Sequence, residues 1–283
     1  MAEFIFRCFA SGSSGNCYYL GNRREGILID AGISARTIRS NLFEMGLDFR
    51  NIMGVLVTHD HADHIRAVGT IGERFHVPIY ATRDIHAGID HNYGVQEKLR
   101  TSRKFYEKGE PFQLCGMTVN TFTISHDSTD CVSYVIDYEG QRFMIATDVG
   151  CVDETLEQYV ETANHLVVEA NHDEQLLLNG PYPSYLKSRI LSDRGHMSNH
   201  TCGLLLSEHH NPGLKNIFLC HLSKENNDPE VALDTVSGYL RGIGVEPGRD
   251  VNLVALERLT PSPVYDLLNN TSSTPGMLNF QTP

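Results

Sequence analysis

Three histidines and two aspartates stand within six residues of one another, in the stretch 59–64, which reads His-Asp-His-Ala-Asp-His. His59 and His61 can converge on one metal ion from an extended loop, whereas Asp63 and His64, at the start of a helix, can turn toward a second. Imidazole nitrogen combined with carboxylate oxygen suits Zn²⁺, Mn²⁺ or Fe²⁺. A single histidine is more often a core or surface residue than a ligand. Three in this arrangement, directly after an apolar run, indicate a metal site.

Further acidic and imidazole side chains stand where other apolar segments end. Asp30 follows the run 27–29, and Asp148 comes shortly after the apolar residues of the segment 142–146. His221 follows the run 217–220 in the same way.

These motifs, in this order, resemble the metallo-β-lactamase superfamily, whose signature is H-x-H-x-D-H. The resemblance runs from about residue 4 to residue 256 and implies a four-layer αββα sandwich of the α/β class, with the site at one edge between the sheets. It also implies seven ligands for two divalent metal ions. They are His59, His61 and His126 for the first ion, Asp63, His64 and His221 for the second, and Asp148 as the bridge. Asp30 would orient the ligands without binding a metal itself.

The aspartate at position 148 separates branches of this superfamily. Antibiotic-hydrolysing members commonly carry cysteine there, whereas phosphodiesterases and glyoxalase-II-type thioesterases carry aspartate. An oxygen bridge suits two metals about 3.5–4 Å apart that share a hydroxide for in-line attack on phosphorus. Only 72 residues separate Asp148 from His221, too few for the inserted cap of the β-CASP nucleases. A glyoxalase-II-type enzyme would need a C-terminal helical domain, which the residues after 260 are too few to build.

The segment Gly195-His196-Met197-Ser198-Asn199 resembles the H-x-S element with which superfamily nucleases hold the scissile phosphate. His196 could stabilise charge or protonate the leaving oxygen. Ser198 and the following backbone N–H groups could bind an anion at a helix start, or Ser198 could simply cap that helix. Asp63 and Asp148 complete the expected catalytic set, with Asp63 taking up the remaining proton.

Two other segments favour a polynucleotide substrate. The Ser/Gly-rich turn 11–16, with Ser13 and Asn16, could line an anion site with its backbone N–H groups, although a tight hairpin explains the same glycines. The stretches around 169–173 and 182–189 are similar to the YycJ/WalJ-type branch, which is associated with 5′→3′ DNA exonuclease activity. That similarity places three residues near the substrate path, with a plain surface position as the alternative for the histidine. They are Asn171, His172 and Arg189.

The favoured hypothesis is a dinuclear metal-dependent phosphodiesterase, a DNA 5′→3′ exonuclease in which a metal-bridging hydroxide attacks the scissile phosphate. The cofactors would be two divalent ions, Zn²⁺ or Mn²⁺ with Fe²⁺ possible, and the partner a nucleic acid, at DNA ends. A thioester or lactone hydrolase of the glyoxalase-II type, an RNA-processing nuclease and a non-catalytic metal-binding module remain alternatives. The net charge of −12 opposes global attraction to nucleic acid, so contacts must be local.

The elements that position these residues follow from periodicity and turn residues. We expect one hydrolase domain over residues 1–259 and a weakly structured tail over 260–283, which is rich in Pro, Ser, Thr and Asn. Strands are expected at 4–9, 17–20, 27–29, 52–57, 79–80, within 112–147, and at 165–169, 216–220 and 252–255. Helices are expected at 34–45, 65–75, 173–179, 198–208 and 229–242.

Composition indicates the class and compartment of the protein. With 41% hydrophobic residues over 283 positions, the chain can bury a substantial core. The seven cysteines include no C-x-x-C pair, which favours reduced thiols in a cytosol over a disulfide framework. No signal peptide and no stretch near 18 apolar residues is evident, so we expect a cytoplasmic protein with no membrane partner.

Overall fold

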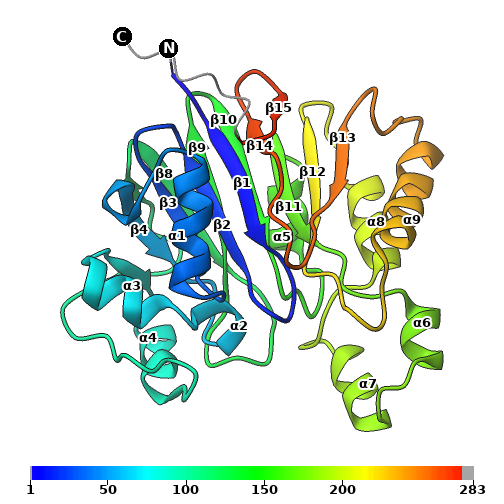
Figure 1. The fold of residues 1–283 in the computed structure, drawn as a ribbon. Helices are drawn as coiled ribbons and strands as arrows, with labels where there is room; N and C mark the ends of the chain where they lie inside the picture. Colours follow the sequence, from blue (N-terminus) through cyan, green and yellow to red (C-terminus); the bar gives the residue numbers. More distant parts are fainter. Residues whose placement is uncertain (1, 276–283) are drawn as a thin grey trace.

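Two β-sheets pack face to face in the computed structural model, which describes residues 2–275, and helices cover the outer side of each sheet (Figure 1). The first sheet has the strand order β15-β14-β1-β2-β3-β4-β5-β6 and the second β13-β12-β11-β10-β9-β8-β7. The strands of the first sheet are β1 (Ile5–Ala10), β2 (Cys17–Gly21), β3 (Gly26–Ile29), β4 (Ile52–Leu56), β5 (Ile79–Ala81), β6 (Arg103–Phe105), β14 (Val264–Asp266) and β15 (Thr271–Ser273). Those of the second are β7 (Phe112–Leu114), β8 (Met117–Thr123), β9 (Val132–Tyr138), β10 (Gln141–Ala146), β11 (His165–Glu169), β12 (Asn216–Cys220) and β13 (Asn252–Ala255).

Strand β10 shows how the layers are built. Phe143 and Ile145 point into the core between the sheets, whereas Met144 and Ala146 belong to a second core beneath the outer helices. Successive side chains of a strand point to opposite faces, so a strand covered on both sides must be apolar throughout. The αββα sandwich expected from the sequence is thereby confirmed.

Helices of the first half cover the first sheet, and helices of the second half cover the second. The first group is α1 (Ala35–Glu44), α2 (Ala62–Ile65), α3 (Val68–Phe75) and α4 (Arg83–His91). The second group is α5 (Glu154–Val160), α6 (Glu174–Asn179), α7 (Ser184–Ile190), α8 (Asn199–Glu208) and α9 (Pro229–Gly242). Polar side chains start several of them: Ser34 accepts a hydrogen bond from the Thr37 N–H, and Ser198 accepts one from the Thr201 N–H.

The predicted helix 65–75 is divided in the structure. Helix α2 ends at Ile65 and α3 begins at Val68, and the Ala67 N–H between them donates to the Ala31 carbonyl at 2.8 Å. This long-range bond ties the break to the loop after β3. The sequence pattern did not predict it because the partner lies far away along the chain.

The expectation of a weakly structured tail from residue 260 is wrong for the part of it that the structure describes. Strands β14 and β15 form a hairpin, and β14 pairs antiparallel with β1 through Phe6 and Tyr265. Leu267 just beyond β14 is completely buried. The polar composition concealed three apolar side chains that complete the sheet. Positions 276–283 of the predicted tail lie outside the described residues.

The parallel strand pairs fix the position of the functional edge. Strand β3 runs parallel to β4, and β10, β11 and β12 run parallel to one another. The carboxyl ends of each set therefore meet at one edge. A β-bridge between His59 and Cys131 joins the sheets there. Within residues 2–275, no helix combines the length and apolar character needed to cross a membrane.

Candidate metal centre

Three residues at strand ends adopt a left-handed backbone conformation. Asp30 after β3 has φ 58°, Asp148 after β10 has φ 57°, and His221 after β12 has φ 54°. Such angles are unfavourable for residues other than glycine and persist where the surroundings enforce them, often at functional sites.

One cluster unites three imidazoles from two loops. The ring centres of His59, His61 and His126 lie 4.7 to 5.1 Å apart, and the His126 Nε2 lies 3.3 Å from the His61 Nδ1. The His59 Nε2 is buried and has no hydrogen-bond partner among residues 2–275. A buried nitrogen without a partner is costly unless something else binds it. The three nitrogens thus converge on one point, as metal ligands must.

A second cluster lies beside the first. The Asp63 Oδ2 lies 3.7 Å from the His64 Nε2 and 3.6 Å from the His221 Nε2, and this nitrogen of His221 also lacks a partner within the described chain. Asp148 stands between the clusters. Its Oδ1 lies 3.7 Å from the His126 Nε2, and its Oδ2 lies 3.2 Å from the His64 Nε2. Its Oδ1 also lies 3.4 Å from the His221 Nδ1, so the carboxylate lies close to both clusters.

The charges of the cluster fit the binding of divalent cations. Burial opposes protonation of His221, but Asp148, Asp63 and Glu169 together raise its pKa to about 10. Burial likewise opposes protonation of His64, yet Asp148, Asp30 and Asp63 raise its pKa well above the usual range. Protons thus occupy positions that a cation would take, since metal binding to imidazole displaces protons. The donors are nitrogen and oxygen without sulfur, which suits Zn²⁺, Mn²⁺ or Fe²⁺.

Asp30 lies directly behind the second cluster. Its Oδ2 accepts hydrogen bonds from the His64 Nδ1 at 2.7 Å and the Thr58 hydroxyl at 2.9 Å, and its Oδ1 accepts from the Thr58 N–H at 2.8 Å. These bonds hold the imidazole with its Nε2 toward Asp148. A carboxylate that fixes the free nitrogen of a ligating histidine is a recurrent feature of metal sites.

Glu169, for which the sequence predicted no role, orients two histidines on the other side of the centre. Its Oε1 accepts from the His196 Nδ1 and from the His221 Nδ1, both at 2.9 Å, while its Oε2 accepts from two backbone N–H groups. Burial would raise its pKa, but His196 and His221 lower it to about 2. The signal was present: like Asp30, Glu169 is an acidic residue at the carboxyl end of a buried strand.

His196, Ser198 and Asn171, which the sequence predicts to contact substrate, differ in the groups that they contact. His196 lies at the metal edge, with its Nδ1 3.6 Å from the Asp148 Oδ1. Ser198 caps α8 and donates to Glu174, so its helix-capping alternative is confirmed. Asn171 donates to the His221 carbonyl at 2.8 Å.

His172 is completely buried rather than on the surface, and neither of its ring nitrogens has a partner within residues 2–275. The surface alternative for this residue is therefore wrong. It lines a cavity of about 170 Å³ that His196 and Ser198 also line.

Arg189 forms an ion pair with Asp127, a residue that the sequence analysis did not single out. Its Nη2 donates to the Asp127 Oδ1 at 3.0 Å, and Nε donates to the other carboxylate oxygen. The Asp127 Oδ1 also lies 3.4 Å from the His126 Nε2. Arg189 thus stands at the rim of the metal centre, one side chain away from a ligand.

The turn 11–16 reaches the metal centre from the opposite side. Asn16 is buried, its Nδ2 lies 2.9 Å from the His64 Nε2, and its N–H donates to the Asp63 carbonyl. The N–H groups of Gly12 and Gly15 are also bonded inside the turn. These three N–H groups are unavailable to an anion, contrary to the site expected there. Ser13 is exposed at the turn's tip.

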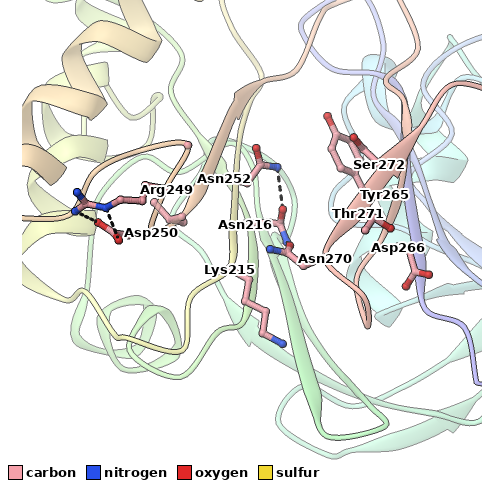
Figure 2. A pocket seen from close by; sticks show the side chains of 12 residues that line it. Lys215, Asn216, Arg249, Asp250, Asn252, Tyr265, Asp266, Asn270, Thr271 and Ser272 are labelled. Carbon is pink, nitrogen blue, oxygen red and sulfur yellow. Dashed lines mark hydrogen bonds and ion pairs between the residues drawn. The ribbon is translucent and has the colours of Figure 1, made fainter.

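A separate hollow of about 270 Å³ lies at the other end of the second sheet, between the starts of β12 and β13 and the β14–β15 hairpin (Figure 2). There Asn252 donates to Asn216, and Asn216 donates to Asn270. Strand β12, five residues long, separates this end from His221, a span of about 17 Å. These amides bond to one another and join the hairpin to the sheet.

Comparison with known proteins agrees with this architecture. The model of the beta-lactamase superfamily domain matches residues 25–214. The chain is 33% identical over 243 residues to a Bacillus anthracis protein named exodeoxyribonuclease YycJ, covering 85% of this chain and 91% of that protein. It is 31% identical over 264 residues to the Streptococcus pneumoniae D39 protein named exodeoxyribonuclease WalJ, covering 93% and 98%.

Solved structures share the fold at low identity. Zn²⁺-bound PqqB from Methylobacterium extorquens superposes with a TM-score of 0.66 at 15% identity, covering 91% of this chain and 99% of that one. YhfI from Bacillus subtilis gives 0.64 at 16% identity, covering 92% and 99%. The predicted ligands lie together at one edge of the sandwich, and the two named relatives match 85% and 93% of this chain. The chain therefore belongs to the metallo-β-lactamase superfamily and is a metal-dependent hydrolase.

Proposed function

We propose that this hydrolase is a dinuclear phosphodiesterase that degrades DNA from the 5′ end. The observation that carries the proposal is the position of His196, which Glu169 holds at the metal edge beside Asp148. A thiolate leaving group depends less on protonation than the alkoxide released from a phosphodiester, so an imidazole positioned beside the ligands favours phosphodiester cleavage. When bound, two divalent cations would lower the pKa of a shared water and supply the nucleophile.

The chain's own residues would then have separate roles. His59, His61 and His126 would hold one cation, Asp63, His64 and His221 would hold the other, and Asp148 would contribute to both. Because the His196 Nδ1 faces the Glu169 carboxylate, the Nε2 of the ring points away from Glu169 and would donate a proton to the leaving oxygen. Asp63, partly exposed at the opening, is the candidate to take up the proton released by the nucleophile.

Substrate contacts would lie around this edge. Arg189 at the rim would attract a phosphate, and the cavity beside His196, lined by His172 and Ser198, would lie next to the leaving group. Asn171 would act through His221, and Asn16 through His64, as positioning residues. Ser13, at the exposed tip of its turn, would contact substrate only at the edge of the binding site.

Two relatives named exodeoxyribonucleases support DNA as the substrate. All seven cysteines are free in the structure, which supports action in the cytoplasm. The acidic charge of the chain is compatible with an enzyme that grips only a strand end, since few phosphates then need neutralising.

The test is an assay of the purified protein with Mn²⁺ or Zn²⁺ on end-labelled single-stranded DNA, double-stranded DNA and RNA. We expect mononucleotides from the 5′ end of DNA, and no cleavage by Asp148→Ala purified in parallel. Faster loss of RNA would favour the RNA-processing alternative. Failure to cleave any polynucleotide with either metal would refute the nuclease and favour a small thioester substrate.

A further inference from the structure

The segment 173–192, which contains α6 and α7, stands beside the metal edge and apart from the sandwich (Figure 1). We call it the α6–α7 arm. Each of its helices contributes a single buried residue, Leu177 in α6 and Ile190 in α7. Helices this short are marginal unless packing supports them. Most of the arm's surface thus faces solvent next to the site.

The arm is joined to the catalytic residues at two points. The Arg189 guanidinium pairs with Asp127, which lies beside His126. The Ile190 carbonyl accepts the His196 N–H at 3.0 Å. The position of α7 is therefore tied to the groups that would handle the scissile phosphate.

One face of α7 carries an exposed aromatic ring in line with Arg189. Tyr185 is 77% exposed and precedes Arg189 by four residues. Residues four apart on a helix lie on the same face, one turn from each other. The face that meets the metal edge through Arg189 thus continues outward to Tyr185.

The arm does not share the net negative charge of the whole chain. The arm contains two acidic residues, Asp173 and Glu174, and two basic residues, Lys187 and Arg189, in a chain whose net charge is −12. Lys187 donates to the carbonyls of Leu178 and Gly180 and so joins the two helices. An exposed aromatic ring one helical turn from an arginine has the chemistry that binds single-stranded nucleic acid, through base stacking and phosphate attraction.

We propose that α7 binds an unpaired stretch of the polynucleotide, with a base stacked on Tyr185 and a phosphate near Arg189. The proposal rests on the proposed nuclease function and adds a substrate preference: an unpaired strand beside the scissile phosphate. Leu176, Leu178 and Leu191 also expose apolar surface on the arm, so a protein partner is the competing occupant. Continuity of the Tyr185 face with the metal edge favours nucleic acid.

The chain contains no tryptophan, which allows a direct optical test. Tyr185→Trp places the only indole on α7, and Phe43→Trp, at a position 80% exposed in the last turn of α1, is the matched control. The probe is a short single-stranded oligonucleotide with phosphorothioate linkages, which resist cleavage. We expect the oligonucleotide to quench Tyr185→Trp fluorescence, its blunt duplex to quench less, and Phe43→Trp to remain unchanged. Absence of quenching, or equal quenching of both variants, would overturn the proposal.

Kinetics separate this inference from the proposed function. Tyr185→Ala should raise KM for single-stranded DNA about tenfold, because stacking on one ring contributes on the order of 1–3 kcal/mol per base. Tyr185→Phe should retain the wild-type KM. Hydrolysis of bis(p-nitrophenyl) phosphate, which is too small to extend from the metal centre to Tyr185, should be equal in all three proteins. If the wild type degrades DNA and Tyr185→Ala has an unchanged KM, the stacking site is wrong although the nuclease stands. If the wild type cleaves no DNA, the nuclease fails, while the quenching experiment still reports whether α7 binds the strand.

Discussion

A single carboxylate oxygen of Glu169 orients two imidazoles, one at the second metal cluster and one at the proposed proton donor. Because both Nδ1 atoms face this oxygen, both rings direct their Nε2 atoms away from it. In Glu169→Gln, we expect kcat to fall about 10- to 100-fold, with weaker metal retention, as follows when the partner of a ligating histidine is lost. Steady-state kinetics and metal analysis after dialysis measure the two effects.

The matched control for this change is Glu161→Gln. Glu161 also accepts a hydrogen bond from a histidine, His209, at 2.8 Å, but its side chain is 53% exposed and it precedes the start of β11, the opposite end of that strand from Glu169. Its replacement should leave kcat and metal content unchanged. Equal activity of Glu169→Gln and Glu161→Gln would show that the carboxylate does not orient the reacting groups.

The ligand types could be predicted at the level of residues because metals impose them. The spacing of His59, His61, Asp63 and His64 indicated a metal site before any fold was known. Glu169 ends a buried strand much as Asp30 follows one, whereas Asp127 had no comparable signal, since it acts through a partner that is distant in sequence. His172 shows the opposite error: a histidine between polar residues suggested a surface position, although the fold buries it.

At the level of elements, the loop after β3 positions the metal-binding loop through a close backbone contact. A Cβ atom on Gly32 would lie 1.5 Å from the Asp63 carbonyl oxygen, which also accepts the Asn16 N–H at 2.7 Å. Gly32→Ala must therefore displace the residues around Asp63. We expect a strong loss of metal affinity and activity together with a lower melting temperature.

Gly238 within α9 is the comparison position, because a Cβ atom there meets nothing within 4 Å. Gly238→Ala should stabilise the protein by about 0.5–1 kcal/mol, as alanine is preferred in a helix interior. Metal content and melting temperature of the two variants are to be measured side by side. A Gly32→Ala protein with normal metal content would contradict the proposed docking of the two loops.

Local signals predicted some elements and missed others for a physical reason. Helices α1 and α8 begin at serine caps that are visible in the sequence. Helix α7 has no side-chain cap and is fixed by the bond between Arg189 and Asp127, 62 residues apart. An ion pair between residues so far apart forms only in the complete fold and produces no periodic pattern in the sequence.

On the scale of the whole molecule, the β14–β15 hairpin completes the first sheet. Val264, Tyr265 and Leu267 are buried, and the Tyr265 ring packs 4.8 Å from that of Phe218 in the second sheet. Truncation after residue 259 should reduce the free energy of unfolding by roughly 5 kcal/mol, from about 1.5–3 kcal/mol for each buried side chain. It also exposes the edge of β1 and so favours aggregation.

Urea unfolding of the truncated and full-length proteins measures this loss. Leu259→Ala, at a position 70% exposed just before the hairpin, is the control and should unfold like the wild type. If truncation leaves stability unchanged, residues after 259 form the dispensable tail that their composition had suggested.

A buried histidine at the start of β11 makes stability depend on pH. Burial, followed by the charge of Lys215, lowers the pKa of His165 to about 4, against roughly 6.5 in an unfolded chain. Between these values the unfolded state binds the proton and the folded state does not, so stability falls as pH falls. From pH 7 to pH 5 the loss is about 2 kcal/mol.

The difference between wild type and His165→Gln isolates this contribution, because the packing cost of the substitution does not depend on pH. Urea unfolding at both pH values should show that the variant loses about 2 kcal/mol less than the wild type on acidification. Parallel losses in the two proteins would show that His165 does not titrate on unfolding.

The most direct test of the central claim is a titration of Mn²⁺ into chelator-treated protein, with bound metal and release of nucleotides from single-stranded DNA followed together. The two clusters that share Asp148 predict that cleavage rises steeply only as the second equivalent binds and then stays constant. Full activity with one equivalent bound, or cleavage that persists without metal, would contradict the two-metal account.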